Sequence, residues 1–327
     1  MDKIQFPYRS YTHLPLLHVI AQSGSWEKHG LTVEYDRPIS SHAAHDAVTS
    51  GAVEFVGGNH VSTYGHRARG DNWVYLGQTV NVIPGRKLIV RADSGINSIA
   101  DLRHRKVGSL GSHPKLNDWL QLKQHGLDVD RDDVEIVDQI PMADDGKSVD
   151  YVNPKAELEA DRLWQWVLDR KVDAAFLGTP SSLFAARAGL KIIDVDAMPM
   201  IYYTTISTNS TFADRYPDIV DRFLKGMIEG IHFLKTEPER SIRFMQQYTV
   251  DGVMEDAIAR ETYRTLAEAL EPNLYPSLAA IANVYEEGVR QDADAKRVNP
   301  LALWDLHFIR HLDDSGFTRG LYEPAAD

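Results

Sequence analysis

The chain has 327 residues, 43% apolar and 25% charged, a composition typical of a globular protein of about two domains. Its 47 acidic and 35 basic residues give a net charge of −12, which makes nucleic acid and anionic membrane surfaces poor partners. The absence of cysteine excludes disulfide scaffolds, thiolate metal sites and cysteine nucleophiles.

The opening segment MDKIQFPYRSYTHLPLLHVIAQSG predicts a strand, a turn and a helix, with no basic and apolar secretion leader before them. No apolar run approaches the roughly 18–20 residues that a transmembrane helix needs, so we expect no membrane insertion. As written, the chain is expected in the cytoplasm. Removal of a leader would instead place it in the periplasm or outside the cell.

Short β-like runs alternate with helical runs over the first two-thirds of the chain. The predicted strands are 3–8, 31–36, 53–58, 73–80, 87–92, 106–110, 134–140, 172–178, 191–196 and 200–208. The predicted helices between them are 14–28, 41–51, 60–69, 114–125, 154–170 and 180–188, and the polar stretch 142–157 is expected to be a long loop. This alternation favours βαβ units and largely parallel sheets.

The pattern changes after residue 209. Two amphipathic segments parted by Pro238 are followed by DAIARETYRTLAEALEP, SLAAIANVYEEGVRQDA and LALWDLHFIRHLDDSGF. Their apolar residues recur at helical spacing, so the C-terminal third is predicted to be nearly all helix.

Four passages carry a resemblance to a known family. They are GSWEKHGLTVEYD, SGAVEFVGGNHVSTYGHRARGDNWVYLGQT, RADSGINSIADLRHRKVGSLG and the ending NPLALWDLHFIRHLDDSGF. In this order they resemble the SsuA/THI5/NMT1-like family of the type II periplasmic-binding-protein fold. The resemblance runs over almost the whole chain, and it is more specific for the fold than for the ligand.

The resemblance implies an α/β protein of two lobes with a helical C-terminal region and a ligand cleft between the lobes. We place lobe I at 1–83 plus 198–327 and lobe II at 84–197. Family members are ABC-type substrate-binding proteins for small anions, and a minority are cytosolic enzymes. A small organic anion is therefore the expected partner, together with an ABC permease if the chain is exported. No cofactor is expected.

Ligands of open α/β sheets lie at the carboxyl ends of strands, against helix N-termini whose free N–H groups suit an anion. Four strand-to-helix junctions qualify. The predicted ligand-binding residues at these junctions are Arg9, Ser10, Thr12 and His13; Gly58, Asn59 and His60; Ser109, Gly111, Ser112 and His113; and Gly178 and Thr179. Each junction is also explained by ordinary helix capping, and it is their number that favours a ligand site.

Histidine is the notable residue type at these junctions. His13, His60 and His113 fall at three predicted cleft mouths, where imidazole can hold an anion or exchange protons. We expect the three to converge on one crevice, with unrelated surface positions as the alternative. His42 and His45 lie three apart on one helix face, but no third ligand is in register, so no metal site is predicted.

The resemblance extends to two kinds of enzyme in the family. In an ungapped alignment with the aromatic sulfinate desulfinase, His45 falls at the catalytic histidine of that enzyme. The nucleophilic cysteine of the desulfinase falls at Tyr11, and its catalytic arginine falls at Phe55. That mechanism is therefore disfavoured, and Tyr11 with His45 is the candidate acid–base pair of another reaction. The thiamine-pyrimidine synthases need a cysteine-rich loop, which this chain lacks.

Two further features lie near the predicted lobe crossings. Strand alternation directs one of Tyr202 and Tyr203 toward the cleft and the other toward a core, and Tyr202 is the candidate for stacking on a ligand. Packing of both rings in the core is the alternative. Arg86 and Arg91 are candidates for pairing with a carboxylate or sulfonate, or else are solvated.

Two functions follow. The first is binding of a small organic anion, a sulfonate, carboxylate or heteroaromatic acid, as the substrate-binding protein of an ABC importer. The second is a cytosolic lyase or hydrolase on the same scaffold, acting on a small aromatic acid through His and Tyr chemistry.

Overall fold

The structure is a computed structural model that describes residues 1–58, 60–109, 112–138, 163–179, 181–247 and 254–323. The chain divides into two compact units. Unit 1 is Met1–Val82 with Pro199–Asp327, and unit 2 is Ile83–Met198. Among the described residues, no helix is long and apolar enough to cross a membrane.

Unit 1 contains five of the described strands. They are β1 (Asp2–Gln5), β2 (Leu31–Glu34), β3 (Val56–Gly57), β4 (Trp73–Val82) and β10 (Pro199–Asn209). β1 pairs with β2 in parallel, and β10 lies antiparallel between β3 and β4. Tyr8 forms parallel bridges to both Pro38 and Gly57, which connects the two sheets.

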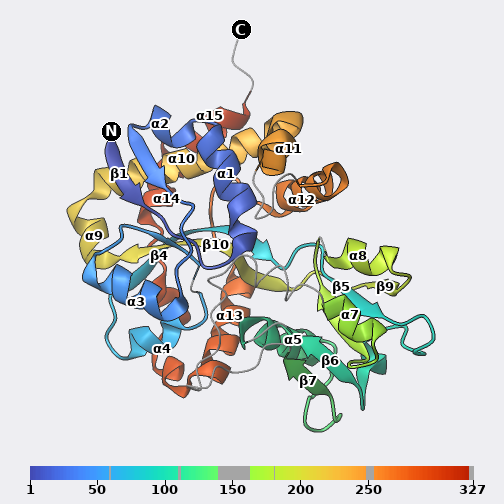
Figure 1. The fold of residues 1–327 in the computed structure, drawn as a ribbon. Coiled ribbons are helices and arrows are strands. Elements are labelled where there is room, and N and C mark those ends of the chain that lie inside the picture. Colours follow the sequence, from blue (N-terminus) through green and yellow to red (C-terminus); the bar gives the residue numbers. More distant parts are fainter. Residues whose placement is uncertain (59, 110–111, 139–162, 180, 248–253, 324–327) are drawn as a thin grey trace. The chain divides into compact units, whose positions relative to one another are not determined.

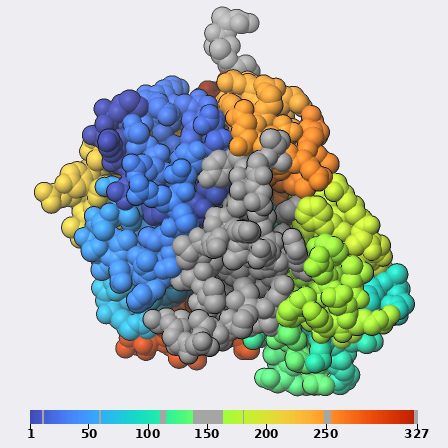
Figure 2. Space-filling model, in the orientation of Figure 1, coloured from blue at the N-terminus to red at the C-terminus, as the bar shows by residue number. Residues whose placement is uncertain are grey.

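Helices surround these strands (Figure 1). From the N-terminal half come η1 (Tyr11–His13), α1 (Leu14–Gln22), α2 (Ser25–Lys28), α3 (Ser41–Ser50) and α4 (Thr63–Ala68). The C-terminal part supplies α9 (Ser210–Arg215), α10 (Pro217–Thr236), α11 (Pro238–Gln247), α12 (Asp256–Ala269), α13 (Leu278–Gln291), η3 (Ala293–Arg297), η4 (Pro300–Leu303), α14 (His307–Asp314) and α15 (Phe317–Tyr322). In the space-filling view the N-terminal segments, in blue, form a continuous face of unit 1 (Figure 2).

Unit 2 is a five-stranded sheet with the order β7-β6-β8-β5-β9. Its described elements are β5 (Lys87–Val90), η2 (Ile99–Leu102), β6 (Lys106–Ser109), α5 (Ser112–Gln124), β7 (Glu135–Asp138), α7 (Leu163–Leu168), β8 (Ala174–Leu177), α8 (Ser181–Arg187) and β9 (Lys191–Asp194). β6 is parallel to β7 and β8, whereas β5 is antiparallel to β8 and β9.

The α/β class and all ten predicted strands are confirmed, with strand ends within three residues of the predicted ones. The expectation of largely parallel sheets is wrong, because among the three described sheets only β1-β2 is parallel, β3-β10-β4 is antiparallel and the five-stranded sheet is mixed. Helical crossovers generate parallel neighbours, but β5 and β10 each follow the preceding strand without a helix and run antiparallel to their neighbours. The predicted loop 142–157 lies outside the described residues.

Two predicted helices are shorter than expected. The predicted helix 14–28 is divided at Gly24, whose φ of +76° is left-handed and ends α1 before α2 begins. The predicted helix 60–69 begins only at Thr63. The C-terminal third is helical as predicted.

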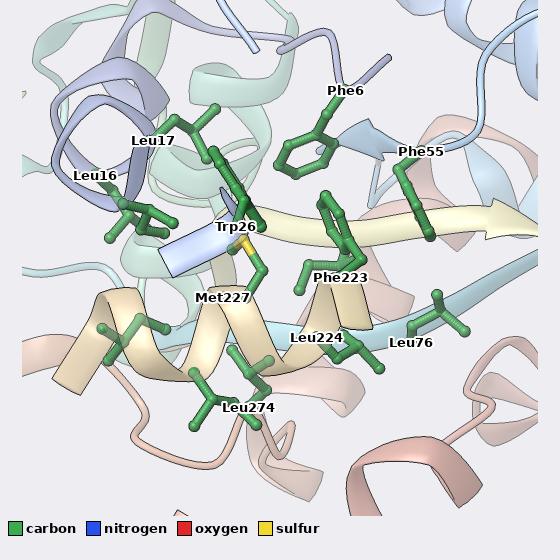
Figure 3. Close-up of a cluster of buried hydrophobic side chains, with 14 of the residues drawn as sticks. Phe6, Leu16, Leu17, Trp26, Phe55, Leu76, Phe223, Leu224, Met227 and Leu274 are labelled. Carbon is green, nitrogen blue, oxygen red and sulfur yellow. The ribbon is translucent and has the colours of Figure 1, made fainter. Parts of the chain in front are cut away.

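The core of unit 1 is organised around α10. Its buried residues, among them Val220, Phe223, Met227 and Ile231, recur every three or four positions and form one apolar stripe. The Phe223 ring stacks on Phe55 at 4.1 Å between centroids and meets Phe6 edge-on at 5.0 Å (Figure 3). Full burial of each such ring contributes about 1.5–3 kcal/mol to stability.

Gly226 of α10 is a site where packing opposes helix propensity. A Cβ there would lie 2.3 Å from Cδ1 of the buried Trp26, whereas a Cβ at Gly320 of α15 would meet nothing within 4 Å. We expect Gly226→Ala to lower the free energy of unfolding by about 1–3 kcal/mol through overpacking. Gly320→Ala should raise it by up to about 1 kcal/mol through helix propensity. Urea denaturation of the two variants tests this, and a stabilised Gly226→Ala would contradict the packing described.

Candidate functional site

A group of polar residues in unit 1 gathers where the loops after β1 and β3 reach β10. We name it the β10 cluster, and its members are Arg9, His13, Gly58, His60, Thr204 and Thr205. The carboxyl end of β1 leads into Arg9, and that of β3 leads into Gly58. Two of the four predicted junctions therefore meet on one strand.

His13 is the most enclosed imidazole of the β10 cluster. It is 4% exposed, and its Nδ1 lies 3.3 Å from the hydroxyl of Thr204. Burial, with a smaller contribution from the positive charge of Arg9, lowers the pKa of His13 to about 3. His13 is therefore neutral near pH 7, and it offers an anion a hydrogen bond rather than a charge.

His60 is held through a defined chain of hydrogen bonds. Gln78 donates from Nε2 to the carbonyl of Tyr202 at 2.6 Å, so its Oε1 is left to accept from the Thr205 hydroxyl at 2.7 Å. Because that hydroxyl has one hydrogen, its oxygen acts as acceptor toward Nδ1 of His60 at 3.5 Å. The Thr205 hydroxyl thus links Gln78 to the His60 ring.

Gly58 allows the side chains of the β10 cluster to pack closely. Its φ is +115°, and a Cβ there would lie 2.8 Å from Cγ of Arg9 and 3.2 Å from Cε1 of His13. The Arg9 amide donates to the carbonyl of Gly57 at 3.1 Å, and its guanidinium donates to the carbonyl of Ile39. These contacts hold Arg9 in the β10 cluster, where its positive charge acts on His13.

Ser10 and Thr12 contribute mainly to the turn before α1. The hydroxyls of Ser10 and Thr12 lie 2.9 Å apart, the Thr12 amide donates to Ser10 Oγ at 3.3 Å, and the His13 amide donates to the Ser10 carbonyl at 3.0 Å. Two of the amides that we expected to cradle an anion are therefore used within the turn. The side chain of Tyr11 lies outside the described residues.

His45 lies in a second group, formed with His66 and Asp71. His45 is 3% exposed, its Nε2 is 3.1 Å from Ser62 Oγ, and its ring stacks on that of His66 with centroids 3.6 Å apart. Burial, and then the charges of His66 and Arg9, lower the pKa of His45 to about 3. His42, three residues earlier, lies on the exposed side of α3 and pairs with Asp46.

The other predicted residues lie in unit 2 or outside the described residues. Ser109 ends β6 with a fully buried hydroxyl, and Gly178 and Thr179 are half-buried between β8 and α8. Asn59 and Gly111 lie outside the described residues, as do the side chains of Ser112 and His113. The convergence of His113 with the other two histidines therefore stays a prediction.

The expected alternation of Tyr202 and Tyr203 is wrong. β10 shifts register on both sides of Tyr202, and Tyr203 has a φ of +54°. Both rings pack against the core of unit 1, with centroids 5.1 Å apart. The irregular backbone removes the simple two-residue period on which the expectation depended.

Arg86 and Arg91 are engaged within unit 2. Arg86 pairs with the buried carboxylate of Asp118 and lies 4.7 Å above the Phe176 ring. Arg91 donates to the carbonyls of Val167 and Val172 at 3.0 and 3.1 Å. Neither arginine is solvated as the alternative supposed, and both stabilise unit 2.

The sequence reasoning missed Gln78, Thr204 and Thr205, which are fully buried. The available signal was the run of hydroxyl residues in TTIST inside a strand otherwise rich in apolar residues. Buried polar side chains need partners, so this run indicates a polar network. It does not reveal that the partners are histidines from two other segments.

The buried His13 predicts an acid-sensitive stability. Below pH 6.5 the unfolded chain gains a proton at His13, whereas the folded chain does not until about pH 3. The free energy of unfolding should therefore fall with decreasing pH in this window, by up to about 1.4 kcal/mol per pH unit, and the effect should vanish above pH 7.

Urea denaturation at several pH values tests this. His13→Asn should reduce the slope of unfolding free energy against pH between 6.5 and 4.5. The expected reduction is up to about 1.4 kcal/mol per pH unit, which corresponds to the uptake of one proton. The control His311→Asn, on an exposed helix surface, should leave the slope unchanged. An unchanged slope in His13→Asn would show that His13 is protonated in the folded chain.

Comparison with known proteins identifies the family. The model of the family described as NMT1/THI5 like matches residues 12–241, more than half of the chain. No curated protein sequence matches.

Solved structures match along nearly the full length of the chain. A putative sulfonate ABC transporter component from Methylobacillus flagellatus KT, the periplasmic sulfonate-binding protein SsuA, is 15% identical with a TM-score of 0.71, covering 100% of this chain and 98% of that one. The desulfurization enzyme DszB is 18% identical with a TM-score of 0.63, covering 96% and 99%.

A Candida albicans protein described as having the generic periplasmic binding protein structural fold is 15% identical with a TM-score of 0.62, covering 93% of this chain and 96% of that one. At such identities the likeness concerns the fold, while the family model reaches the sequence itself. The chain therefore belongs to the NMT1/THI5-like family and has the periplasmic-binding-protein fold.

Proposed function

We propose that this chain binds a small organic anion, of the sulfonate or carboxylate class, as the substrate-binding protein of an importer. Its family membership and the sulfonate-binding protein of the same fold support this. The net charge of −12 does not oppose it, because an anion is recognised by the local field of its site rather than by the total charge.

The observation that carries the proposal is the position of Arg9. The Cβ and Cγ atoms of Arg9 pack over Gly58 at the carboxyl ends of β1 and β3, and its guanidinium donates to the carbonyl of Ile39. Its positive charge acts on the neutral imidazole of His13. A planar guanidinium binds carboxylate or sulfonate oxygens with two parallel hydrogen bonds. A neutral imidazole beside it can add a hydrogen bond without a second desolvated charge.

The proposal also assigns ligand contacts to unit 2. We place the ligand between lobe I (1–83 plus 198–327) and lobe II (84–197), with Ser109, Gly178 and Thr179 as the contribution of lobe II. Closure of two lobes over a ligand would exclude water and strengthen the pairing with Arg9. A permease would then recognise the closed form.

A second candidate is an enzyme that uses His45. The buried imidazole of His45 is neutral near pH 7 and hydrogen-bonded to Ser62, so it can accept a proton, and its pKa of about 3 makes it a weak base. The desulfinase mechanism has less support, because Phe55, which falls at its arginine position, is stacked in the core on Phe223. The enzyme candidate therefore requires a reaction other than sulfinate displacement.

Ligand screening tests the binding proposal. We expect a sulfonate or a carboxylate to raise the melting temperature, and Arg9→Gln to weaken its binding at least about ten-fold through loss of a charge-assisted pair. The control Arg37→Gln removes an arginine that is 69% exposed and should change affinity little. Equal affinity of Arg9→Gln and the unchanged chain would overturn the proposal.

The two candidate functions separate in a second experiment. The substitutions Tyr11→Phe and His45→Gln remove the two candidate catalytic groups. A binding protein should keep its ligand affinity within a few-fold in both variants and release the ligand chemically unchanged. Consumption of the bound acid, abolished in both variants while binding persists, would establish the enzyme instead. Mass spectrometry of the recovered ligand is the measurement.

A further inference from the structure

We propose that His45, His66 and Asp71 form a binding site for one divalent transition-metal ion in unit 1. The inference goes beyond the proposed anion binding and does not depend on it. Sequence reasoning set a metal aside because His42 and His45 lacked a third ligand on their helix. The structure instead supplies His66 and Asp71 from another segment.

The three ligands come from α3, from α4 and from the turn after α4. His45 is on α3, and His66 is in the last turn of α4. Gly70, with a φ of +106°, reverses the chain so that the Asp71 amide donates to the His66 carbonyl at 3.2 Å. The turn therefore returns the Asp71 carboxylate to the His66 ring, and Figure 1 shows α3 and α4 as neighbours.

The spacing of the donor atoms fits a small ion. Asp71 Oδ2 lies 3.1 Å from Nδ1 of His66 and 3.8 Å from Nδ1 of His45. One donor atom of each residue lies within 4.8 Å of the others. Ligands about 2.0–2.2 Å from a tetrahedral ion are roughly 3.3–3.6 Å apart. Small shifts of the Asp71 carboxylate, together with a tilt of the His66 ring away from its stack on His45, would complete three corners of the tetrahedron.

The second observation is a buried donor atom without a partner. The His45 side chain is 4% exposed, and among the described residues its Nδ1 has no hydrogen-bond partner. Its other nitrogen, Nε2, is 3.1 Å from Ser62 Oγ. When Nε2–H donates to Ser62, the lone pair of Nδ1 is directed to the cluster. Such an outer hydrogen bond is what orients metal-binding histidines.

The competing explanation is that His66 and Asp71 form a hydrogen bond that holds the turn in place without a metal ion. Donation from His66 Nδ1–H to Asp71 would satisfy these two residues. It leaves Nδ1 of His45 unexplained, although the ring is fixed between His66 and Trp73, with centroids 3.6 and 4.6 Å away. An ion that replaces the His66 proton would satisfy all three groups at once.

The surroundings indicate the kind of ion. His66 and Asp71 are 32% and 26% exposed, so an ion can enter and keep water as a fourth ligand. Two imidazoles and one carboxylate favour Zn²⁺, Co²⁺ or Ni²⁺ over Mg²⁺ or Ca²⁺. The nearby cation Arg69 pairs with Asp292 at 2.6 Å and Asp294 at 3.4 Å, which reduces its repulsion of the ion.

The experiment uses the full chain, treated with a chelator and dialysed, and titrated with Co²⁺ and Zn²⁺. We expect one ion per chain, visible absorption of four-coordinate Co²⁺, and a rise in melting temperature with Zn²⁺. His66→Gln and Asp71→Asn change partly exposed residues, so folding should be retained, as circular dichroism without metal will verify. Each should lower metal affinity at least about ten-fold.

The matched control is His42→Gln on the same helix. The His42 side chain is 81% exposed, and its Nε2 lies 3.8 Å from Oδ2 of Asp46. An adventitious metal ion would therefore bind at this exposed pair. Affinity should be unchanged in this variant. The proposal is overturned if no ion binds, if His42→Gln abolishes binding, or if binding survives in both His66→Gln and Asp71→Asn.

Discussion

Strand β10 is the constraint on which the candidate site depends. It is hydrogen-bonded on both sides, to β3 and to β4, and its register shifts between Tyr202 and Thr205. The hydroxyl of Thr79 donates to the carbonyl of Thr204 at 2.9 Å and accepts from its amide at 3.2 Å, so a side chain replaces the missing ladder bonds. This irregular stretch presents the hydroxyls that hold His13 and His60.

Buried polar groups give the β10 cluster its rigidity and set its charge. The imidazole of His13 is enclosed and neutral, so the positive charge of the cluster belongs to Arg9. An enclosed pair of cations would be costly, because each would need compensation for its lost hydration. A neutral ring beside a single guanidinium avoids that cost, while still offering directional hydrogen bonds. The same arrangement suits an anion that carries one negative charge.

The group formed by His45, His66 and Asp71 is held mainly by contacts between rings. The His45 ring stacks on that of His66 and packs at a tilt against the Trp73 indole, and Asp71 pairs with His66. The group lies within electrostatic reach of Arg9, which contributes to lowering the pKa of His45. The β10 cluster and this group thus share one region of unit 1. A change of charge in one group will therefore change the electrostatic potential at the other.

The sequence by itself determined the α/β class, the ten strands and the helical C-terminal third, because these depend on local periodicity that each segment carries. It also indicated Arg9, His13 and His60, since the residues at strand ends follow from the order of elements. Tertiary structure alone decided their partners. Thr204 is 191 residues from His13, and Thr205 is 145 residues from His60. Similarly, the union of His45 with His66 and Asp71 depends on how α3 packs beside the turn after α4. Such contacts are set by the burial of whole elements against each other, and no spacing along the chain encodes them.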